Sequence, residues 1–149
     1  MRKIEWASPE NLEYIVASQL KMALETEDLE LSPTVVRKGV QAVFDDPSKG
    51  RYLLCLEEEK VCGVLIVINE WSDWRNGNVQ WIHSVFVEKD QRGTGVFKSM
   101  YEFLKTKVEA DDLLAGLRLY VDKTNKNAIS VYQKIGMNRD HYHMFEWLK

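Results

Sequence analysis

The alternation of hydrophobic and polar positions predicts a strand over residues 81–87, followed by a turn and a helix. β-branched and aromatic residues alternate with polar ones in this stretch, as they do on half-buried strands. After the turn, apolar residues recur at the spacing of one helical face: Val96, Met100, Leu104 and Val108. Gly93 and Gly95 fall at the junction of the two elements. The rest of the chain is organised around this strand, turn and helix.

Similar patterns predict the other elements. Strands are expected over residues 3–6, 51–57, 60–70, 117–121 and around 139–148, and Gly116 should open the strand at 117–121. Helices are expected after the Ser-Pro pairs at 8–9 and 32–33, where a capping serine precedes a proline at the first helical position. A last helix should end at Gly136.

Two further patterns predict how these elements are arranged. Residues 61–68 are apolar on both faces, so their strand should be central and covered by helices on each side. The order strand, helix, strand after residue 81 implies a right-handed crossover between parallel strands. Residues 71–78 contain a turn-forming Asn-Gly pair and are expected to be a loop.

Composition bounds the class of protein. At 149 residues, with 45% hydrophobic and 29% charged residues, the chain fits one soluble globular domain, 1–149. No apolar stretch approaches the ~18 residues of a transmembrane helix, and no signal-peptide core follows Met1, so we expect a cytoplasmic protein without a membrane partner. The net charge of −3 argues against a nucleic-acid partner, which needs a basic face.

The cysteines and histidines do not have the spacing of a metal site. CxxC and HExxH are absent, and His141 and His143 have no further ligand nearby in sequence. Cys55 and Cys62 fall in neighbouring predicted strands, and in a chain without an export signal we expect buried free thiols in place of a disulfide. The sequence therefore predicts no metal.

The turn after residue 87 has the features of an anion site. The first turn of a helix presents backbone N–H groups without intrahelical partners, and the helix dipole adds partial positive charge there. Gly93 and Gly95 have no side chains to hold a phosphate away, and the flanking Arg92 adds positive charge, as does Lys98. A Walker loop is excluded because Phe97 replaces its last glycine, and a dinucleotide fingerprint because Lys98 stands at its third glycine. Glycine spacing alone also allows an ordinary turn into a helix.

Two segments resemble motifs of the GCN5-related N-acetyltransferase (GNAT) family. Residues 92–97, Arg-Gly-Thr-Gly-Val-Phe, resemble its acyl-CoA signature, Gln/Arg-x-x-Gly-x-Gly/Ala, except that Phe97 replaces the final small residue. Residues 125–137 resemble its later segment, Asn-x-x-Ala-x-x-x-Tyr-x-x-x-Gly-Phe/Met. The order of predicted elements also follows the family, so the resemblance covers essentially the whole chain. Because backbone N–H groups make the contacts at the signature, Phe97 is expected to narrow the pocket without abolishing it.

The resemblance implies a fold and a co-substrate, acetyl-CoA. The fold is α/β: a single GNAT-like domain with a mixed sheet of about seven strands, helices on both faces, and two splayed parallel strands that hold acyl-CoA. The pantetheine arm would pair with the strand backbone, and the pyrophosphate would lie on N–H groups of the turn. The cofactor-binding residues implied in this way are Val85, Phe86, Val87, Arg92, Gly93, Thr94, Gly95, Val96, Phe97, Lys98 and Asn125.

Transfer of an acyl group to an amine needs a proton path. An amine with a pKa near ~10.4 is neutral only about once in ~2,500 molecules at pH 7, a cost of roughly 4.6 kcal/mol. His83 stands where some family members carry Glu, and an imidazole suits a base at neutral pH. Glu70 or Asp73 acting through water is an alternative, as is a merely hydrogen-bonded strand histidine at His83. Tyr132 matches the family's general acid, which protonates the leaving thiolate; otherwise it is a core aromatic of its helix.

The acceptor site is marked by charge and by aromatic residues. Residues 25–30 place four carboxylates in six positions, and in the fold that the resemblance implies this loop overhangs the acceptor side of the thioester. Glu25 and Glu27 would favour a cationic acceptor. Trp71 and Trp74 would add cation–π attraction of roughly 0.5–2 kcal/mol. The alternatives are a merely solvated acidic loop and tryptophans that cover local core.

The leading interpretation is an acyl-CoA-dependent N-acyltransferase that transfers an acetyl group from acetyl-CoA to a primary amine. The amine would attack directly in a ternary complex, because no Cys stands at a position suited to an acyl-enzyme. The acceptor would be a small molecule, cationic on the charge argument. The alternative is a non-catalytic acyl-CoA-binding sensor or interaction module. Whether the chain forms a homodimer is left open.

Overall fold

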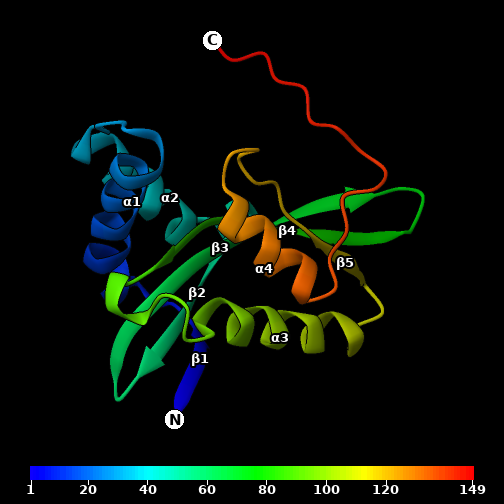
Figure 1. Cartoon of the computed structure of the whole chain (residues 1–149), viewed down its shortest axis with the longest axis horizontal. Coiled ribbons are helices and arrows are strands. Elements are labelled where there is room, and N and C mark those ends of the chain that lie inside the picture. The colour runs from blue at the N-terminus through cyan, green and yellow to red at the C-terminus, as the bar shows by residue number, and fades with distance from the viewer. The chain divides into compact units, whose positions relative to one another are not determined.

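Five strands form one sheet in the computed structural model, which describes residues 1–149 (Figure 1). They are β1 (Arg2–Trp6), β2 (Arg51–Glu57), β3 (Lys60–Ser72), β4 (Gly77–Val87) and β5 (Leu114–Arg118). The strands lie in the order β1-β2-β3-β4-β5, and every neighbouring pair is antiparallel except β4 and β5, which are parallel. β3 is therefore central, as its two apolar faces predict.

The chain divides into two compact units, Met1–Arg118 and Leu119–Lys149. The first unit holds the whole sheet and three α-helices, α1 (Leu12–Glu27), α2 (Pro33–Asp45) and α3 (Val96–Glu109). It also holds short 3₁₀ turns at Pro9–Asn11, Pro47–Lys49 and Lys89–Gln91. The second unit holds one helix, α4 (Lys126–Lys134). None of the four α-helices has the length and hydropathy needed to cross a membrane.

α1 and α2 lie side by side and pack on one face of the sheet (Figure 1). Ile15 of α1 and Val40 of α2 share a core with alternate residues of β2 and β3, such as Leu54 and Val64. Burying each of these side chains contributes roughly 1.5–3 kcal/mol. Ser32 starts α2 as predicted, because its Oγ accepts from the backbone N–H of Val35.

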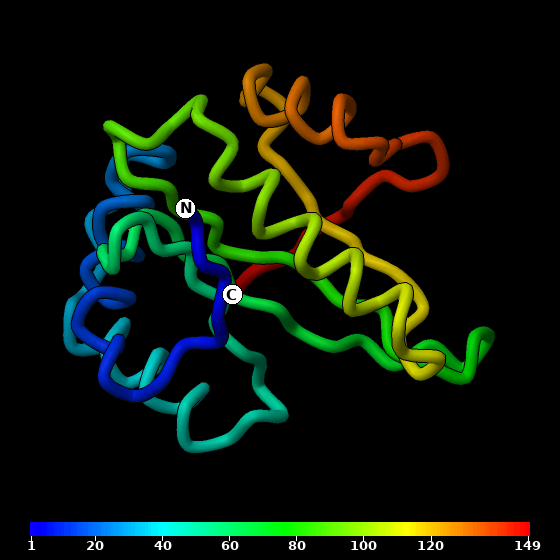
Figure 2. Tube along the Cα trace, turned by 90° about the horizontal axis from the view of Figure 1, so that it is seen from below, coloured from blue at the N-terminus to red at the C-terminus, as the bar shows by residue number.

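α3 packs on the opposite face of the sheet, and Figure 2 shows it lying along the strands. Gly63 of β3 is the point of close approach, since a Cβ built there would lie 2.7 Å from Cγ1 of Val96. Met100 and Leu104 are completely buried beneath the helix, as their spacing predicts. The absence of a side chain at Gly63 thus sets how closely the N-terminal turn of α3 approaches β3.

The hairpin between β3 and β4 is longer than the sequence suggests. Its ladder continues to the pair Ser72 and Gly77, so the turn is confined to residues 73–76. Asn76, with a φ of 48°, supplies the left-handed position that closes a tight turn. The expected loop over 71–78 is therefore wrong, because strand pairing extends to the Asn-Gly turn and includes Trp71 in β3.

β5 also begins earlier than expected. The strand predicted at 117–121 is found at Leu114–Arg118, and Gly116 lies inside it, paired with Val79. The backbone N–H of Asn78 donates to the carbonyl of Leu113 at 2.8 Å, just ahead of the first parallel pair. The start of this strand is thus set by pairing with β4 and not by the glycine.

The second unit contains no strand. Residues 139–148 alternate in hydrophobicity, yet they form no ladder, so the sheet has five strands and not about seven. A strand needs hydrogen-bonding partners for its backbone, and alternation within one segment does not supply them. Large apolar side chains of this segment are exposed: Tyr142, Met144, Phe145, Trp147 and Leu148.

The end of α4 agrees with the sequence. The helix ends at Lys134, and Gly136 follows it with a left-handed φ of 92°, as expected of a glycine that terminates a helix.

Cys55 and Cys62 are free and buried, as expected. The thiol of Cys62 donates to the carbonyl of Cys55 at 3.3 Å. Burial raises the pKa of Cys55 to about 12. Cys55 is therefore a neutral thiol that packs as a small apolar side chain.

Candidate functional site

β4 carries an extra residue in its second half. Val64 of β3 pairs with Phe86, whereas Ile66, two residues further, pairs with His83, so β4 is longer than β3 between these pairs. Ser84 takes up the extra length with a φ of 51°, which is uncommon for a residue other than glycine. Such a β-bulge bends the strand and redirects its backbone groups, and bulges are over-represented beside active sites.

The same half of β4 extends beyond its parallel neighbour. The β4–β5 ladder covers residues 78–81 of β4, and β5 has no residue paired with β4 beyond Trp81. Val85, Phe86 and Val87 therefore have backbone groups on a side of the sheet that β5 does not cover. An extended ligand can pair with such groups as an added strand does. β5 itself ends at Arg118, the partner of Trp81, so the second half of β4 has no parallel neighbour in the first unit.

The turn that follows β4 ends at the N-terminus of α3. Gly93 and Gly95 have φ values of 77° and 90°, a conformation that other residues adopt only under strain. A Cβ built at Gly93 would meet nothing within 4 Å. The first hydrogen bond of α3 runs from the N–H of Ser99 to the carbonyl of Gly95 at 3.0 Å, so earlier N–H groups of this turn have no acceptor within the helix. Backbone donors and open space meet here, as an anion site requires.

The cations at this turn have acidic partners. Arg92 donates to the carbonyl of Val87 at 2.9 Å and to Oε2 of Glu25 at 2.5 Å. Lys98 lies 3.7 Å from Glu102, one helical turn away. The carboxylates of Glu25 and Glu102 therefore balance part of the positive charge of Arg92 and Lys98. The backbone N–H groups and the helix dipole are further sources of positive potential at this turn.

Glu25 and Glu27 belong to α1, which extends to Glu27, and not to the loop expected over 25–30. Asp28 ends the helix with a left-handed φ of 50°. The Glu25 carboxylate in α1 accepts a hydrogen bond from Arg92 in the turn before α3. The Glu27 side chain is exposed. The structure thus brings one predicted acceptor residue together with one predicted phosphate-site residue.

His83 lies on the face of the sheet that α1 and α2 cover, because it pairs with Ile66 of their shared core. Its ring stacks on that of Trp81, with centroids 6.0 Å apart. Partial burial lowers the pKa of His83 from its ordinary value of 6.5, so the imidazole is mainly neutral at pH 7. A neutral imidazole can accept a proton, as a general base must.

Glu70, an alternative base, is held by two donors. Nε1 of Trp81 donates to its Oε2 at 2.7 Å, and Arg118 donates to its Oε1 at 3.3 Å. The hydrogen bond from its indole N–H thus fixes the Trp81 ring, which stacks on His83. Asp73, the other alternative, is exposed in the β3–β4 turn.

Trp71 and Trp74 lie at the opposite end of β4 from the glycine turn. They are 60% and 87% exposed, at or near the tip of the β3–β4 hairpin. From Gly77 to Val87 the strand spans roughly 33 Å at about 3.3 Å per residue. The structure therefore does not bring these tryptophans to Glu25, and they do not cover local core.

The remaining predicted residues lie in the second unit. Asn125 caps α4, because its Oδ1 accepts from the N–H of Ala128 at 3.1 Å. Tyr132 is half-buried on α4, and burial raises its pKa above the ordinary value of 10. The phenol therefore keeps its proton at neutral pH, as a general acid must.

Two contacts at the site have no local sequence signal. Arg2 donates to Thr94 in the glycine turn, 92 positions away. Tyr14 of α1 donates from its hydroxyl to Oε1 of Glu88 at 3.1 Å, where the chain leaves β4. Only the pairing of distant elements creates these contacts, so no motif could have predicted them. No cluster of three or more His, Cys, Asp or Glu side chains could hold a metal ion.

The unpaired half of β4, its bulge and the glycine turn place an open strand edge next to a helix N-terminus in a mixed α/β fold. The model of the acetyltransferase (GNAT) family matches residues 12–137, which include parts of both compact units. The chain therefore belongs to the GNAT acetyltransferase family.

Solved structures with the same fold include other members of this class. A possible acetyltransferase from Clostridium difficile 630 is 37% identical, with a TM-score of 0.92 over 100% of this chain and 98% of that one. A ribosomal-protein-alanine N-acetyltransferase from Brucella melitensis biovar Abortus 2308 is 13% identical, with a TM-score of 0.80 over 100% of both chains. An aminoglycoside acetyltransferase from an uncultured soil metagenomic sample is 16% identical, with a TM-score of 0.76 over 99% of this chain and 97% of that one. No curated protein matches the chain in sequence.

Proposed function

We propose that residues 1–149 act as one N-acetyltransferase domain, which transfers an acetyl group from acetyl-CoA to a primary amine. The observation that carries this proposal is the course of β4. Its bulge at Ser84 and its uncovered edge lead directly into a glycine turn at a helix N-terminus. An extended arm and a pyrophosphate, joined as they are in CoA, match these two features in order.

The residues present fit such a ligand. Backbone groups of Val85, Phe86 and Val87 would pair with the amides of the pantetheine arm. The N–H groups from Gly93 to Lys98 would hold the pyrophosphate, since the space at Gly93 is open. The ring of Phe97 packs beside Tyr101, with centroids 6.4 Å apart, so the departure from the family signature leaves this backbone in place. Bound acetyl-CoA supplies an acetyl thioester, an activated acyl group.

The side chains supply the proton path for direct attack by the amine in a ternary complex. The neutral His83 takes a proton from the acceptor ammonium, which otherwise costs roughly 4.6 kcal/mol to deprotonate at pH 7. Tyr132, protonated at neutral pH, donates to the leaving thiolate. Asn125 of the same unit adds a cofactor contact through the part of its amide that the helix cap does not use.

The acceptor is a small primary amine with further positive charge. Glu27 is exposed at the end of α1, and Glu25 forms an ion pair with Arg92. Carboxylates at this point favour cationic acceptors over anionic ones. Trp71 and Trp74 contribute only to an acceptor long enough to reach the hairpin, because they lie at the far end of β4.

Two measurements test the proposal in sequence. First, saturating CoA should raise the melting temperature, because ligand at ~100 times its dissociation constant adds about 2.7 kcal/mol to the free energy of unfolding. Gly95→Glu should abolish this shift, because a side chain disfavours the φ of 90° that the turn adopts there and the carboxylate adds negative charge next to the anion site. Unchanged melting in the parent with CoA would show that the proposal is wrong.

Second, thiol release from acetyl-CoA should depend on an added amine pool, with products identified by mass spectrometry. Cationic amines should react fastest, and Glu27→Gln should lower their rates. Glu109 is exposed at the C-terminal end of α3, so Glu109→Gln is the matched control and should leave these rates unchanged. CoA binding without thiol release would instead support the acyl-CoA-binding module. Best rates with anionic acceptors would overturn the charge argument alone.

A further inference from the structure

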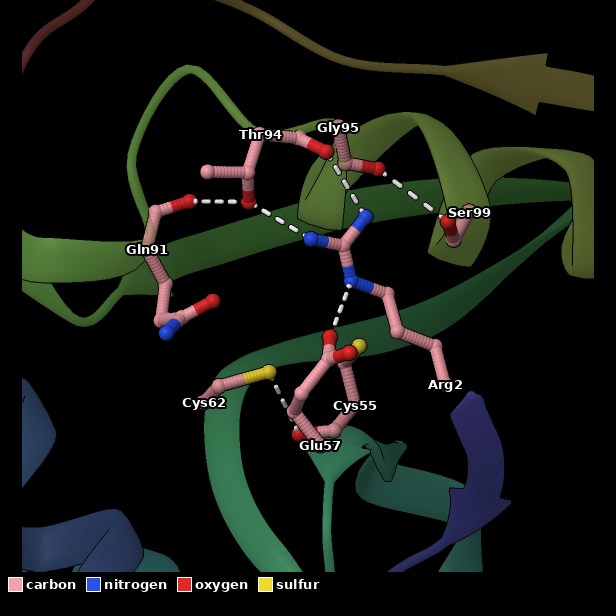
Figure 3. Close-up of polar contacts among 8 residues, drawn as sticks. All are labelled: Arg2, Cys55, Glu57, Cys62, Gln91, Thr94, Gly95 and Ser99. Carbon is pink, nitrogen blue, oxygen red and sulfur yellow. Dashed lines mark hydrogen bonds and ion pairs between the residues drawn. The ribbon is translucent and has the colours of Figure 1, made fainter.

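Arg2, the first residue of β1, reaches the glycine turn (Figure 3). Its Nη1 donates to the carbonyl of Thr94 at 2.8 Å, and its Nη2 donates to Oγ1 of the same residue at 2.6 Å. Its Nε donates to Oε2 of Glu57, at the end of β2, at 2.7 Å. One guanidinium thus ties the turn to the edge of the sheet.

The turn has its own internal bonds on either side of this contact. The hydroxyl of Thr94 donates to the carbonyl of Gln91 at 2.8 Å, while its oxygen accepts from Arg2. The hydroxyl of Ser99 donates to the carbonyl of Gly95 at 3.1 Å (Figure 3). Thr94 is the one residue between Gly93 and Gly95, so its side chain is the one that this part of the turn offers to a partner.

The contact with the Thr94 carbonyl also orients a donor. A trans peptide is planar, with its C=O and N–H on opposite sides. Because the carbonyl of Thr94 faces Arg2, the N–H of Gly95 in the same peptide points away from Arg2. Gly95 on one side of this peptide lowers the barrier to its rotation, and Arg2 restricts that freedom.

Arg2 acts here by its shape and not by its charge. The carboxylate of Glu57 balances the guanidinium, and their side chains are only 23% and 35% exposed. A planar guanidinium can donate two N–H groups to one residue and a third to a carboxylate, whereas an ammonium cannot reproduce this fork.

We propose that Arg2 is a positioning residue for the phosphate site of the glycine turn: it holds the Thr94–Gly95 peptide with its N–H directed to the ligand. This inference rests on the proposed function, because the ligand is the pyrophosphate of acetyl-CoA. Arg2 does not touch the ligand. Its loss should weaken recognition of the phosphates and leave recognition of the pantetheine arm unchanged.

The test compares acetyl-CoA with S-acetylpantetheine, which has the same arm and thioester but lacks the pyrophosphate. Arg2→Gln should lower kcat/KM for acetyl-CoA about tenfold, chiefly through KM, because hydrogen bonds to charged groups are lost from the turn. The value for S-acetylpantetheine should stay within about twofold of the parent. Arg2→Lys should not rescue, since it keeps the charge and loses the fork.

Two further variants make the test specific. Arg37→Gln removes another arginine that pairs with a carboxylate, Glu13 between α2 and α1, and should change neither substrate. Thr94→Val removes only the hydroxyl contacts of an exposed residue, so it tests the same contact if Arg2→Gln fails to fold. It should weaken acetyl-CoA less than Arg2→Gln does. The loss in the double variant should be smaller than the product of the two single losses, because both changes remove the same Arg2–Thr94 hydrogen bond.

Three outcomes decide the matter. A loss confined to acetyl-CoA in both Arg2→Gln and Thr94→Val supports the inference. Equal losses with both substrates, or no loss in either variant, would overturn the inference about Arg2. The proposed function would still stand in that case, because the parent protein turns over acetyl-CoA. A parent that neither binds CoA nor turns over acetyl-CoA removes the proposed function, and the role of Arg2 falls with it.

Discussion

His83 is the residue at which burial and chemistry meet most directly. Burial lowers its pKa from 6.5, and a base works only when neutral, so kcat/KM of the parent should fall as the pH drops through a value below 6.5. His83→Ala should remove this acidic limb and lower the rate about 10²-fold or more at pH 7. The measurement is kcat/KM for acetyl-CoA as a function of pH, with the amine at saturating concentration. A limb that persists in the variant would move the base to Glu70, Asp73 or water.

Tyr132 should affect turnover and not cofactor affinity. Its pKa is raised by burial, so the hydroxyl is protonated and can act on the leaving thiolate. Tyr132→Phe should lower kcat about tenfold or more and keep the dissociation constant of CoA within a few-fold. Tyr101→Phe, in the buried face of α3, is the matched control and should leave kcat unchanged. Equal kcat for Tyr132→Phe and the parent would assign Tyr132 to packing alone.

At the scale of single residues, the sequence could name the glycines of the turn but not their partners. Gly93 and Gly95 have the positive φ that their role in a tight turn requires. Arg92 was expected to add positive charge at the turn, and nothing in the sequence indicated that Glu25 of α1 would pair with it. A motif specifies residues close in the chain, and it carries no information on side chains that arrive from another helix.

Among the elements, the contact between α3 and β3 gives a test of packing. A methyl group at Gly63 would lie 2.7 Å from Cγ1 of Val96, so α3 must shift to admit it. Gly63→Ala should lower the free energy of unfolding by about 1–3 kcal/mol. Urea denaturation monitored by circular dichroism measures this change.

The control for this prediction is a second glycine. Gly39 lies inside α2, and a Cβ there would meet nothing within 4 Å. Gly39→Ala should therefore raise the free energy of unfolding by about 0.5–1 kcal/mol, because alanine favours a helix. Two Gly→Ala changes of the same sign would contradict the packing argument.

Helices were easier to predict than strand ends. The helical face of α3 and the serine cap of α2 depend on residues within one or two turns, and both are found as predicted. The ends of β3 and β5 depend on ladder pairs with β4, which lies elsewhere in the chain. Residues 139–148 have the alternation of a strand without a ladder, for the same reason.

Over the whole molecule, the class of fold and the family followed from two short segments. Residues 92–97 and 125–137 led to the family, and the family model covers residues 12–137. The mixed sheet, with β3 at its centre and β4 and β5 as its parallel pair, agrees with that expectation. The acceptor does not follow from either segment, because exposed side chains such as Glu27 and Trp74 depend on where neighbouring elements end.

The uncovered half of β4 also bears on how the protein behaves at high concentration. A strand edge with available backbone groups can pair with another chain, and natural proteins usually protect such edges from aggregation. If acetyl-CoA covers this edge, the co-substrate also protects the protein from self-association. Light scattering during mild heating should therefore rise more slowly with CoA than with the same concentration of adenosine, which lacks the arm. Equal scattering in the two samples would mean that this edge is not where the chains first meet.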